Sequence, residues 1–370
     1  MKILIYNFTI PHLLSGNEEY QGGTAVALLN WIKAFKSLGH EVALLTWKGA
    51  KEIIKTKVDF DIIESYDPKV GIPKLRLLYI HIPSVIRDIK NYNPDIIIQA
   101  GASVNSLIMG ISSKIVHKKF IHRLASDADV DHRTNEFLDN TSLFFYKKSG
   151  KLIDVFSVQN DYQFNTLKEL YPTKKIFKVH NPFNGFINTA NLPRSERKYV
   201  AWVGHFRRVK NLMTLADICS QMKDIEFKIA GIPYENLDAD STDSIEKLKK
   251  MSNVEFVGYI NPSQVQKFLS TALCLLNTSY LEGFSNTFLE AWSVGTPIIT
   301  TNQVNPDNLI GNYQVGLIAN SFEELPAKLN EIINFSDDEY NKISKRCYDY
   351  VVQNHDPIIL AKIFISKIFD

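Results

Sequence analysis

Two glutamates, Glu282 and Glu290, stand eight positions apart around a glycine-containing loop that runs into a predicted helix. Glu290, about one turn into the helix, can accept two hydrogen bonds from a ribose diol, and Glu282 can reach a sugar hydroxyl. Ser285 or Asn286 can cap the helix, and its first amides favour an anion such as a diphosphate. The turn consists of Phe284, Ser285, Asn286 and Thr287. The alternative is an exposed acidic pair flanking an ordinary helix cap.

A basic loop follows a predicted strand that ends at Gly204. Glycine lets the backbone approach a ligand, and Arg207, Arg208 and Lys210 place three cations beside it. Such cations would balance a diphosphate and stabilise the negative charge that grows on it as it leaves. A basic loop is also compatible with a solvated surface, so it indicates a site only together with the glutamate pair.

Together these segments resemble family 4 of the GT-B glycosyltransferases. Residues 204–211 resemble the family's G-R-x-x-x-x-K-[GN] segment, residues 282–290 match its E-x7-E motif, and residues 290–297 are close to its E-A-x-x-x-G-x-P. Gly22-Gly23-Thr24 looks like the glycine-rich loop after the family's first strand. The resemblance covers essentially the whole chain. It implies a GT-B fold, with two doubly wound Rossmann-like domains facing across a cleft, and transfer of a sugar from a nucleoside diphosphate sugar with retention of configuration.

The resemblance also implies roles for single residues. Glu290 would hold the donor ribose, Glu282 the transferred sugar, and Lys210 the donor phosphates. The family's arginine after the glycine is His205 here, so Arg207 or Arg208 would take over its role.

Further residues follow from the same resemblance. Gly22 and Gly23 would let the backbone approach the donor phosphates or the acceptor, unless they are turn chemistry only. Tyr259 follows a strand end and would flank the nucleotide base. Ser126 and Asp127 stand where many family members have a functional His-Asp pair, so the histidine's role has no counterpart and Asp127 is expected on the acceptor side.

Alternating aspartates, Asp127, Asp129 and Asp131, could be read as a D-x-D metal site or as the start of a calcium loop. The sixth position of such a loop is His132 rather than glycine, and the twelfth is Leu138 rather than glutamate, which argues against calcium. We interpret the segment as a solvated loop with capping aspartates, with acceptor contact as the alternative. The expectation is no metal and no cofactor besides the nucleotide-sugar co-substrate.

Two series of short apolar strands alternate with amphipathic segments, which is typical of parallel α/β folds. The first is predicted at residues 2–6, 41–46, 95–99, 120–125, 155–158 and 175–179, and the second at 199–203, 226–230, 254–257, 274–276, 297–300 and 315–318. The polar stretch 193–198 is interpreted as a linker. We expect an N-terminal acceptor-binding domain over 1–186, a C-terminal donor-binding domain over 187–355, and a helix at about 356–370 that packs back on the first domain.

The composition is that of a globular protein with substantial cores: 370 residues, 45% hydrophobic and 22% charged, which exceeds the usual size of a single core. No apolar run reaches the roughly 18 residues that span a bilayer. Three cysteines, Cys219, Cys274 and Cys347, lie far apart without metal-ligand spacing. They predict reduced thiols and a cytoplasmic protein.

The charge is unevenly distributed: residues 1–186 hold 24 Lys and Arg against 18 Asp and Glu, and the remainder holds 18 against 22. A positive first half indicates an anionic partner such as a phosphorylated acceptor or a membrane surface, and no nucleic acid is expected. The apolar stretch 75–89 is flanked by cations, as in an interfacial helix, although it could equally pack in the core. These cations are Lys74, Arg76, Arg87 and Lys90, and a second cluster contains Lys114, His117, Lys118 and Lys119.

The function favoured by these features is retaining transfer of a hexose to a glycan or lipid-linked acceptor, in synthesis of a cell-surface polysaccharide or glycoconjugate. One alternative is a nucleotide-sugar epimerase on the same fold, for which no acid-base set is identified. The other is a non-catalytic sugar-nucleotide-binding subunit. Such a subunit could lose its donor residues, whereas Lys210, Glu282 and Glu290 are all present.

Overall fold

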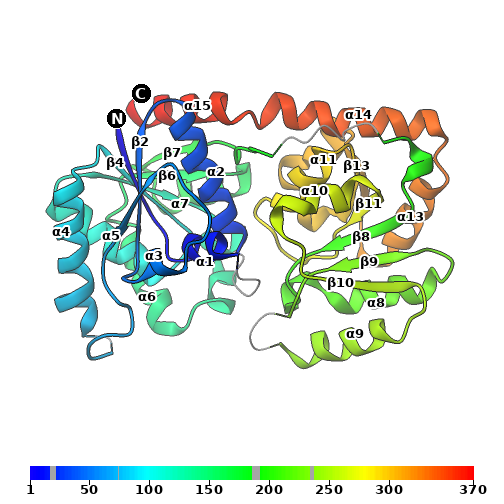
Figure 1. Ribbon diagram of the computed structural model, residues 1–370, viewed down its shortest axis with the longest axis horizontal. Coiled ribbons are helices and arrows are strands. Elements are labelled where there is room, and N and C mark those ends of the chain that lie inside the picture. Colours follow the sequence, from blue (N-terminus) through cyan, green and yellow to red (C-terminus); the bar gives the residue numbers. More distant parts are fainter. Residues whose placement is uncertain (17–21, 74, 186–191, 234–236) are drawn as a thin grey trace. The chain divides into compact units, whose positions relative to one another are not determined.

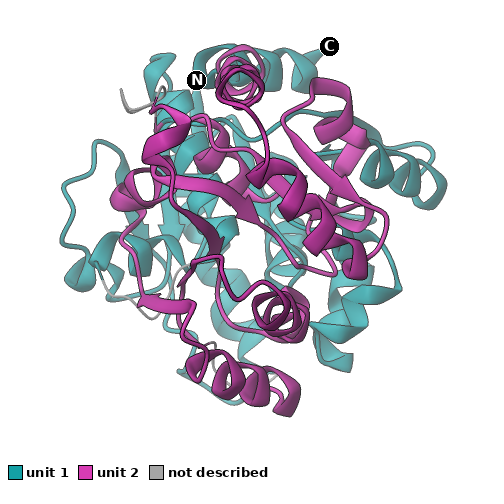
Figure 2. Ribbon diagram, turned by 90° about the vertical axis from the view of Figure 1, so that its right-hand side faces the viewer, with its two compact units in different colours: residues 1–184, 356–370 teal, residues 185–355 magenta. Residues whose placement is uncertain are grey.

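The computed structural model describes residues 1–16, 22–73, 75–185, 192–233 and 237–370. The chain forms two compact units, each built on its own parallel sheet (Figures 1 and 2). The first unit comprises residues 1–184 and 356–370, and the second comprises residues 185–355. The chain therefore leaves the first unit at residue 184 and returns to it at residue 356.

The first unit contains seven parallel strands in the order β3-β2-β1-β4-β5-β6-β7. The strands are β1 (Lys2–Tyr6), β2 (Glu41–Thr46), β3 (Asp61–Glu64), β4 (Ile96–Ala100), β5 (Lys119–Arg123), β6 (Val155–Val158) and β7 (Lys175–Lys178). The side chains of the five inner strands are mostly buried on both faces of the sheet, which explains the nearly continuous apolar runs of these strands in the sequence. Only β3 was not predicted. It is a four-residue edge strand with one exposed and three half-buried side chains, so its apolar signal is weak.

Helices cover both faces of this sheet. They are α1 (Ile10–Ser15), α2 (Gly23–Ser37), α3 (Ala50–Ile53), α4 (Ile82–Tyr92), α5 (Val104–Ile115), α6 (Asn140–Ser149), α7 (Asp161–Leu170) and α15 (Pro357–Phe369), with short helical turns η1 (Leu77–His81), η2 (Asp127–Val130) and η3 (His132–Glu136). The C-terminal helix α15 packs against α2 (Figure 1). Phe364 of α15 is fully buried, and its ring centroid lies 4.8 Å from that of Trp31, 5.4 Å from Phe35 and 5.2 Å from Phe177.

The second unit contains six parallel strands in the order β10-β9-β8-β11-β12-β13. The strands are β8 (Tyr199–Val203), β9 (Phe227–Ala230), β10 (Val254–Gly258), β11 (Ala272–Leu276), β12 (Ile298–Thr301) and β13 (Gly316–Ala319). The helices are α8 (Leu212–Gln221), α9 (Ala239–Lys249), α10 (Pro262–Ser270), α11 (Asn286–Trp292), α12 (Leu309–Tyr313), α13 (Leu325–Ile333) and α14 (Asp337–Asn354), with turns η4 (Arg194–Glu196), η5 (Arg208–Lys210), η6 (Asn302–Val304), η7 (Pro306–Asn308) and η8 (Phe322–Glu324). The predicted α/β class with two parallel sheets is confirmed, and each predicted strand overlaps an observed one.

The polar stretch 193–198 lies inside the second unit, unlike the linker expected from its composition. Arg197 is 2% exposed, and its guanidinium donates to the carbonyl oxygens of Ala272 and Val294 and to the hydroxyl of Thr296. A buried cation of this kind needs several acceptors, and the fold supplies them from two separate segments, at residue 272 and at residues 294–296. Composition alone cannot distinguish such a residue from an exposed one.

Candidate active site

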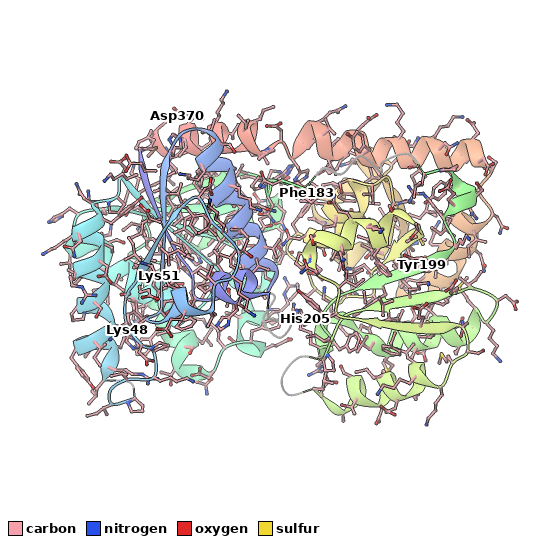
Figure 3. All side chains as sticks on the ribbon, viewed as in Figure 1. Lys48, Lys51, Phe183, Tyr199, His205 and Asp370 are labelled. Atoms are coloured by element: carbon pink, nitrogen blue, oxygen red, sulfur yellow. The ribbon has the colours of Figure 1, made fainter. Side chains whose placement is uncertain are left out.

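The second unit brings its basic loop and its glutamate loop together at the C-terminal ends of β8 and β11. These strands are neighbours, yet β8 leads into α8 and β11 leads towards α11 on the opposite face of the sheet. Doubly wound sheets bind ligands at the strand ends where the chain diverges to opposite faces in this way. Figure 3 labels Tyr199 at the start of β8 and His205 beyond its end, which locates this edge.

At this edge Lys210 and Glu282 form an ion pair. The ammonium group of Lys210 contacts Oε1 of Glu282, and their side chains are only 11% and 15% exposed. Ser279 also donates to Oε1 of Glu282, at 3.1 Å. The pair is separated by 72 positions in the chain, and its partial burial makes the interaction stronger than one in open solvent.

Three glycines bring the loops after β8, β9 and β10 close together. Gly231 has φ +150°, and a Cβ there would lie 1.9 Å from the carbonyl oxygen of Gly204, so no other residue fits without moving the backbone. Its amide donates to the carbonyl of Gly258 at 2.8 Å. The carbonyl group of Gly204 therefore packs against Gly231, at the end of β9. The Cα of Gly204 faces the side chain of Lys210, whose Cε would lie 3.3 Å from a Cβ on Gly204.

The two arginines of the basic loop extend into solvent. Arg207 and Arg208 are exposed, and neither guanidinium group makes a hydrogen bond or ion pair with a residue that the structure describes, although their backbone carbonyls accept from the amides of Lys210 and Asn211. His205 is half-buried at the preceding turn, and Tyr259 is half-buried beyond Gly258. The loop therefore presents two long, exposed guanidinium side chains in addition to the ammonium group of Lys210, which is held in its ion pair.

Helix α11 begins as the sequence predicts, but its cap differs. Ser285 is the N-cap residue, and its hydroxyl pairs with that of Thr287 at 2.8 Å instead of capping the helix. Phe284 is buried, with its ring 5.4 Å from His355, and Asn286 is half-buried at the first helical position. The first turn of α11 therefore receives no side-chain cap from Ser285.

Glu290 is the most perturbed carboxyl group of this region. Desolvation by burial raises its pKa to about 8. Its carboxylate makes no hydrogen bond or ion pair within the described part of the chain, although its backbone carbonyl accepts from Ser293. A carboxylate that is withdrawn from water and lacks a partner is typical of a ligand-binding position.

Four predicted site residues lie in the first unit. Gly22 is the N-cap of α2 and Gly23 its first residue; Gly22 has φ −89°, and nothing lies within 4 Å of where its Cβ would be. The fold therefore does not require glycine at Gly22. Ser126 caps η2, accepting from the amide of Ala128, and Asp127 accepts hydrogen bonds from Asn160 and Gln163, each at 2.8 Å. Burial raises the pKa of Asp127.

The alternating aspartates each have a structural partner. Asp129 accepts from the amides of Ala125 and Ser126, and burial raises its pKa to about 6. Asp131 pairs with Arg133 and accepts from Tyr162. These side chains do cap turns, but Asp129 is half-buried and not solvated as expected. No group of three His, Cys, Asp or Glu side chains within the described ranges is arranged to hold a metal ion.

The structure thus joins Lys210 and Glu282, places the remaining donor candidates on neighbouring loops of the second unit, and places Gly22, Gly23, Ser126 and Asp127 in the first. Sequence reasoning missed Thr278 and Ser279, which contact the ion pair. Their small polar side chains carry no motif, and only the short interval before Glu282 could have drawn attention to them.

Comparison with known proteins finds a family match within the second unit. The family model described as "Glycosyl transferases group 1" matches residues 186–350. A curated relative, the alpha-monoglucosyldiacylglycerol synthase of Streptococcus pneumoniae, is 26% identical over 145 residues. That match covers 39% of this chain and 32% of the relative, so it spans about a third of the relative's length.

Solved structures match over the full chain. Sucrose-phosphate synthase from Thermosynechococcus elongatus has a TM-score of 0.76 at 18% identity, over 100% of this chain and 98% of that chain. A TarM mutant of S. aureus, solved in complex with fondaparinux, alpha-GlcNAc-glycerol and UDP, has a TM-score of 0.77 at 11% identity, over 99% of both chains. Identities this low show the fold alone, and that fold is GT-B.

Proposed function

We propose that this protein is a glycosyltransferase that moves a hexose from a nucleoside diphosphate sugar to a glycan or lipid-linked acceptor, with retention of configuration. The observation that carries the proposal is the edge of the second unit, where the Lys210–Glu282 pair accompanies the desolvated, unpartnered carboxylate of Glu290. These residues fall inside the region that matches the glycosyltransferase family model.

The chemistry assigns a role to each group. Glu290 accepts hydrogen bonds from the two ribose hydroxyls, and Glu282 binds a hydroxyl of the transferred sugar. Lys210, with Arg207 or Arg208, stabilises the negative charge that develops on the departing diphosphate. The bond from the anomeric carbon to the phosphate oxygen breaks, and the acceptor oxygen bonds to that carbon on the same face. The acceptor proton moves to the departing phosphate oxygen, so no protein nucleophile is needed.

The donor charge is balanced by side chains in this proposal, without a metal ion. Lys210 and the two arginines supply three cations, which is enough to offset a diphosphate. Asp127, Asp129 and Asp131 are already used as acceptors within the first unit, which disfavours a D-x-D metal site. UDP is a reasonable first nucleotide to test, because TarM was solved with it.

The acceptor is proposed to reach the enzyme at the inner face of the cell membrane. Between β3 and α4, five large apolar side chains are 52–66% exposed, and a cation, Lys69, is exposed beside them. The five are Val70, Ile72, Leu75, Leu78 and Tyr79, which we call the apolar segment. Apolar side chains beside cations favour an anionic lipid surface. The relative from S. pneumoniae is named for a glucosyl lipid product, which agrees with such an acceptor.

Other parts of the expected basic region behave differently. Ile82 is buried in the core, as expected if the apolar stretch 75–89 packs inside the protein. Lys74 lies outside the described residues. In the second cluster, Lys114 pairs with Asp154, and Lys119 donates to the backbone carbonyl of Ile368. These two lysines have partners within the fold, and the proposed membrane surface does not include them. No helix in the described ranges is long and apolar enough to span a bilayer.

A panel of nucleotide sugars tests the proposal. Thermal unfolding is measured with UDP-, GDP- and ADP-sugars, and one of them is expected to raise the melting temperature. Hydrolysis of that donor is then followed without acceptor, with and without EDTA. Slow release of free sugar and nucleoside diphosphate that persists in EDTA is expected. An altered nucleotide sugar would indicate an epimerase, binding without turnover a non-catalytic subunit, and loss of turnover restored by manganese a metal-dependent enzyme.

A further inference from the structure

We infer that Thr278 and Ser279 act as a clamp that positions the two partners of the Lys210–Glu282 pair, Thr278 holding the lysine and Ser279 the glutamate. Both residues follow β11, and they are 0% and 1% exposed. The inference rests on the proposed function for its catalytic meaning, since it assigns positioning residues to that site.

The first half of the clamp is a chain of hydrogen bonds through the hydroxyl of Thr278. Nε1 of Trp202 in β8 donates to Oγ1 of Thr278 at 3.1 Å, and Oγ1 donates to the backbone carbonyl of Lys210 at 2.7 Å. An indole nitrogen can only donate, so the hydroxyl must accept from Trp202, and its single proton is left for Lys210. The direction of both bonds is therefore determined.

The second half of the clamp holds the carboxylate. The hydroxyl of Ser279 donates to Oε1 of Glu282, the same oxygen that contacts Lys210. The amide of Ser279 donates to Oδ1 of Asn277 at 3.0 Å, which fixes the backbone from which this side chain projects. Consecutive residues thus hold opposite ends of one ion pair.

Further contacts leave the lysine little freedom. The amide of Tyr280 donates to the carbonyl of Val209 at 2.9 Å, so the turn that carries Lys210 is held at two successive carbonyls. Its side-chain stem packs against Gly204. Because the backbone of Lys210 and the aliphatic part of its side chain are both held, its ammonium group is confined to one position. An ammonium placed in advance loses less entropy when it binds a phosphate, which favours turnover.

Thr278→Val tests the clamp, because valine keeps the shape and removes the hydroxyl. The readout is acylation of the Lys210 amine by an amine-reactive ester, followed by peptide mass spectrometry. Loss of one net hydrogen bond is expected to free the lysine and raise its labelling rate about tenfold. Thr278→Ser, which keeps the hydroxyl, should label at the wild-type rate. Thr278→Ala removes the same hydroxyl and replaces the valine variant if that variant does not fold.

Thr300→Val is the matched control. Thr300 of β12 is also 0% exposed and lies in the same sheet, but its Oγ1 has no hydrogen-bond partner in the described structure. The control should leave labelling unchanged. If Thr278→Val lowers the melting temperature and labels Lys210 at the wild-type rate, the hydroxyl serves packing only and the clamp is wrong.

A second arm separates the clamp from the proposed function. Labelling of wild-type Lys210 is repeated with UDP, GDP or ADP, and one of these is expected to protect the lysine. Protection should weaken about tenfold in affinity in Thr278→Val and recover in Thr278→Ser. If no nucleotide protects Lys210 but labelling still responds to Thr278→Val, the clamp stands and the donor assignment fails.

Discussion

Glu290 and Lys210 show two ways in which a single side chain can be prepared for a ligand. Lys210 is already paired, so a donor phosphate must compete with Glu282 or share the ammonium with it. The carboxylate of Glu290 has no partner among the described residues and is partly withdrawn from water, so under the proposed function the donor would supply its first hydrogen bonds. The pairing of Lys210 fixes the position of its ammonium group. The unpartnered carboxylate of Glu290 would instead contribute to affinity, because a new hydrogen bond to a desolvated carboxylate gains more free energy than the exchange of one partner for another.

Replacing Lys210 with alanine is expected to lower kcat by about ten- to a hundredfold, since a charge-assisted contact to the leaving group contributes about 1.5–3 kcal/mol. Steady-state kinetics with the donor found in the panel measure the effect. Lys228→Ala is the matched control, because Lys228 of β9 also pairs with glutamates of the second unit, Glu226 just before β9 and Glu255 of β10, and none of the three is a site candidate. Equal losses in both variants would contradict a specific role for Lys210.

Glu290 also predicts how stability depends on pH. Its pKa is about 8 in the folded protein and about 4.5 in the unfolded chain, so between these values the folded state binds one more proton. The free energy of unfolding should therefore fall as pH rises from about 4.5 to 8 and become independent of this group above that. Glu290→Gln removes the dependence and should stabilise the ligand-free protein at pH 8 by on the order of 2 kcal/mol while abolishing donor binding. Denaturant unfolding of the wild type and of Glu290→Gln at pH 5 and pH 8 measures the two free energies of unfolding. If both proteins change equally between these pH values, the prediction is wrong.

At the scale of elements, the site depends on the loops that leave adjacent parallel strands. β8 and β11 pair side by side although β9 and β10 lie between them in the chain. This arrangement brings the turn at Lys210 against the loop at Thr278, and the glycine contacts between Gly204 and Gly231 hold the outer side of that turn. Each loop is thus anchored by a different neighbouring strand.

Helix α15 shows that the first unit depends on the end of the chain. Phe364→Ala is expected to destabilise this unit by about 3–5 kcal/mol, because it removes a fully buried ring that contacts Trp31, Phe35 and Phe177. Thermal or urea unfolding measures the change. The adjacent Ile363 is 38% exposed, so Ile363→Ala should stay within about 0.5 kcal/mol of the wild type. Similar stability of the two variants would show that α15 does not pack as described.

At the scale of the whole molecule, the sequence separates charge between its halves, and the Lys210–Glu282 pair and the apolar segment lie in different units. Apart from Gly22 and Gly23, the donor candidates lie in the second unit, whose part of the chain is acidic overall. The apolar segment lies in the first unit, whose part of the chain is basic. Such a division suits an enzyme that takes a dissolved donor on one unit and a surface-bound acceptor on the other.

Vesicle binding checks this division. The protein is expected to sediment with anionic vesicles at low salt, less at high salt and little with neutral vesicles, since each basic residue near the surface contributes about 1 kcal/mol. Leu78→Ser, at a side chain 66% exposed, should reduce binding. Leu170→Ser, at a leucine 56% exposed on α7 outside the apolar segment, should not. A wild-type protein that stays in the supernatant with anionic vesicles at low salt would point to a soluble acceptor.

Local patterns in the sequence determined the class of fold. Strands that bury most of their side chains carry short apolar runs, and twelve of the thirteen strands were located from such runs, although β9 and β10 each include one charged residue. The start of α11 and the spacing of Glu282 and Glu290 are likewise local, because capping residues and helix periodicity act over a few positions. The edge strand β3 escaped detection since its side chains are half-buried or exposed and its sequence carries both kinds of residue.

Tertiary structure alone decided which side chains meet. Nothing in the order of residues says that Lys210 contacts Glu282 or that Thr278 reaches its carbonyl, because these contacts follow from the order of strands in the sheet. The sequence also does not determine that Arg197 is buried and Leu78 exposed. A buried cation can be hydrogen-bonded by carbonyls far away in the chain, and an apolar side chain can remain on the surface. Interactions within a few residues leave a pattern in the sequence, whereas those between strand ends depend on packing that the chain achieves only when folded.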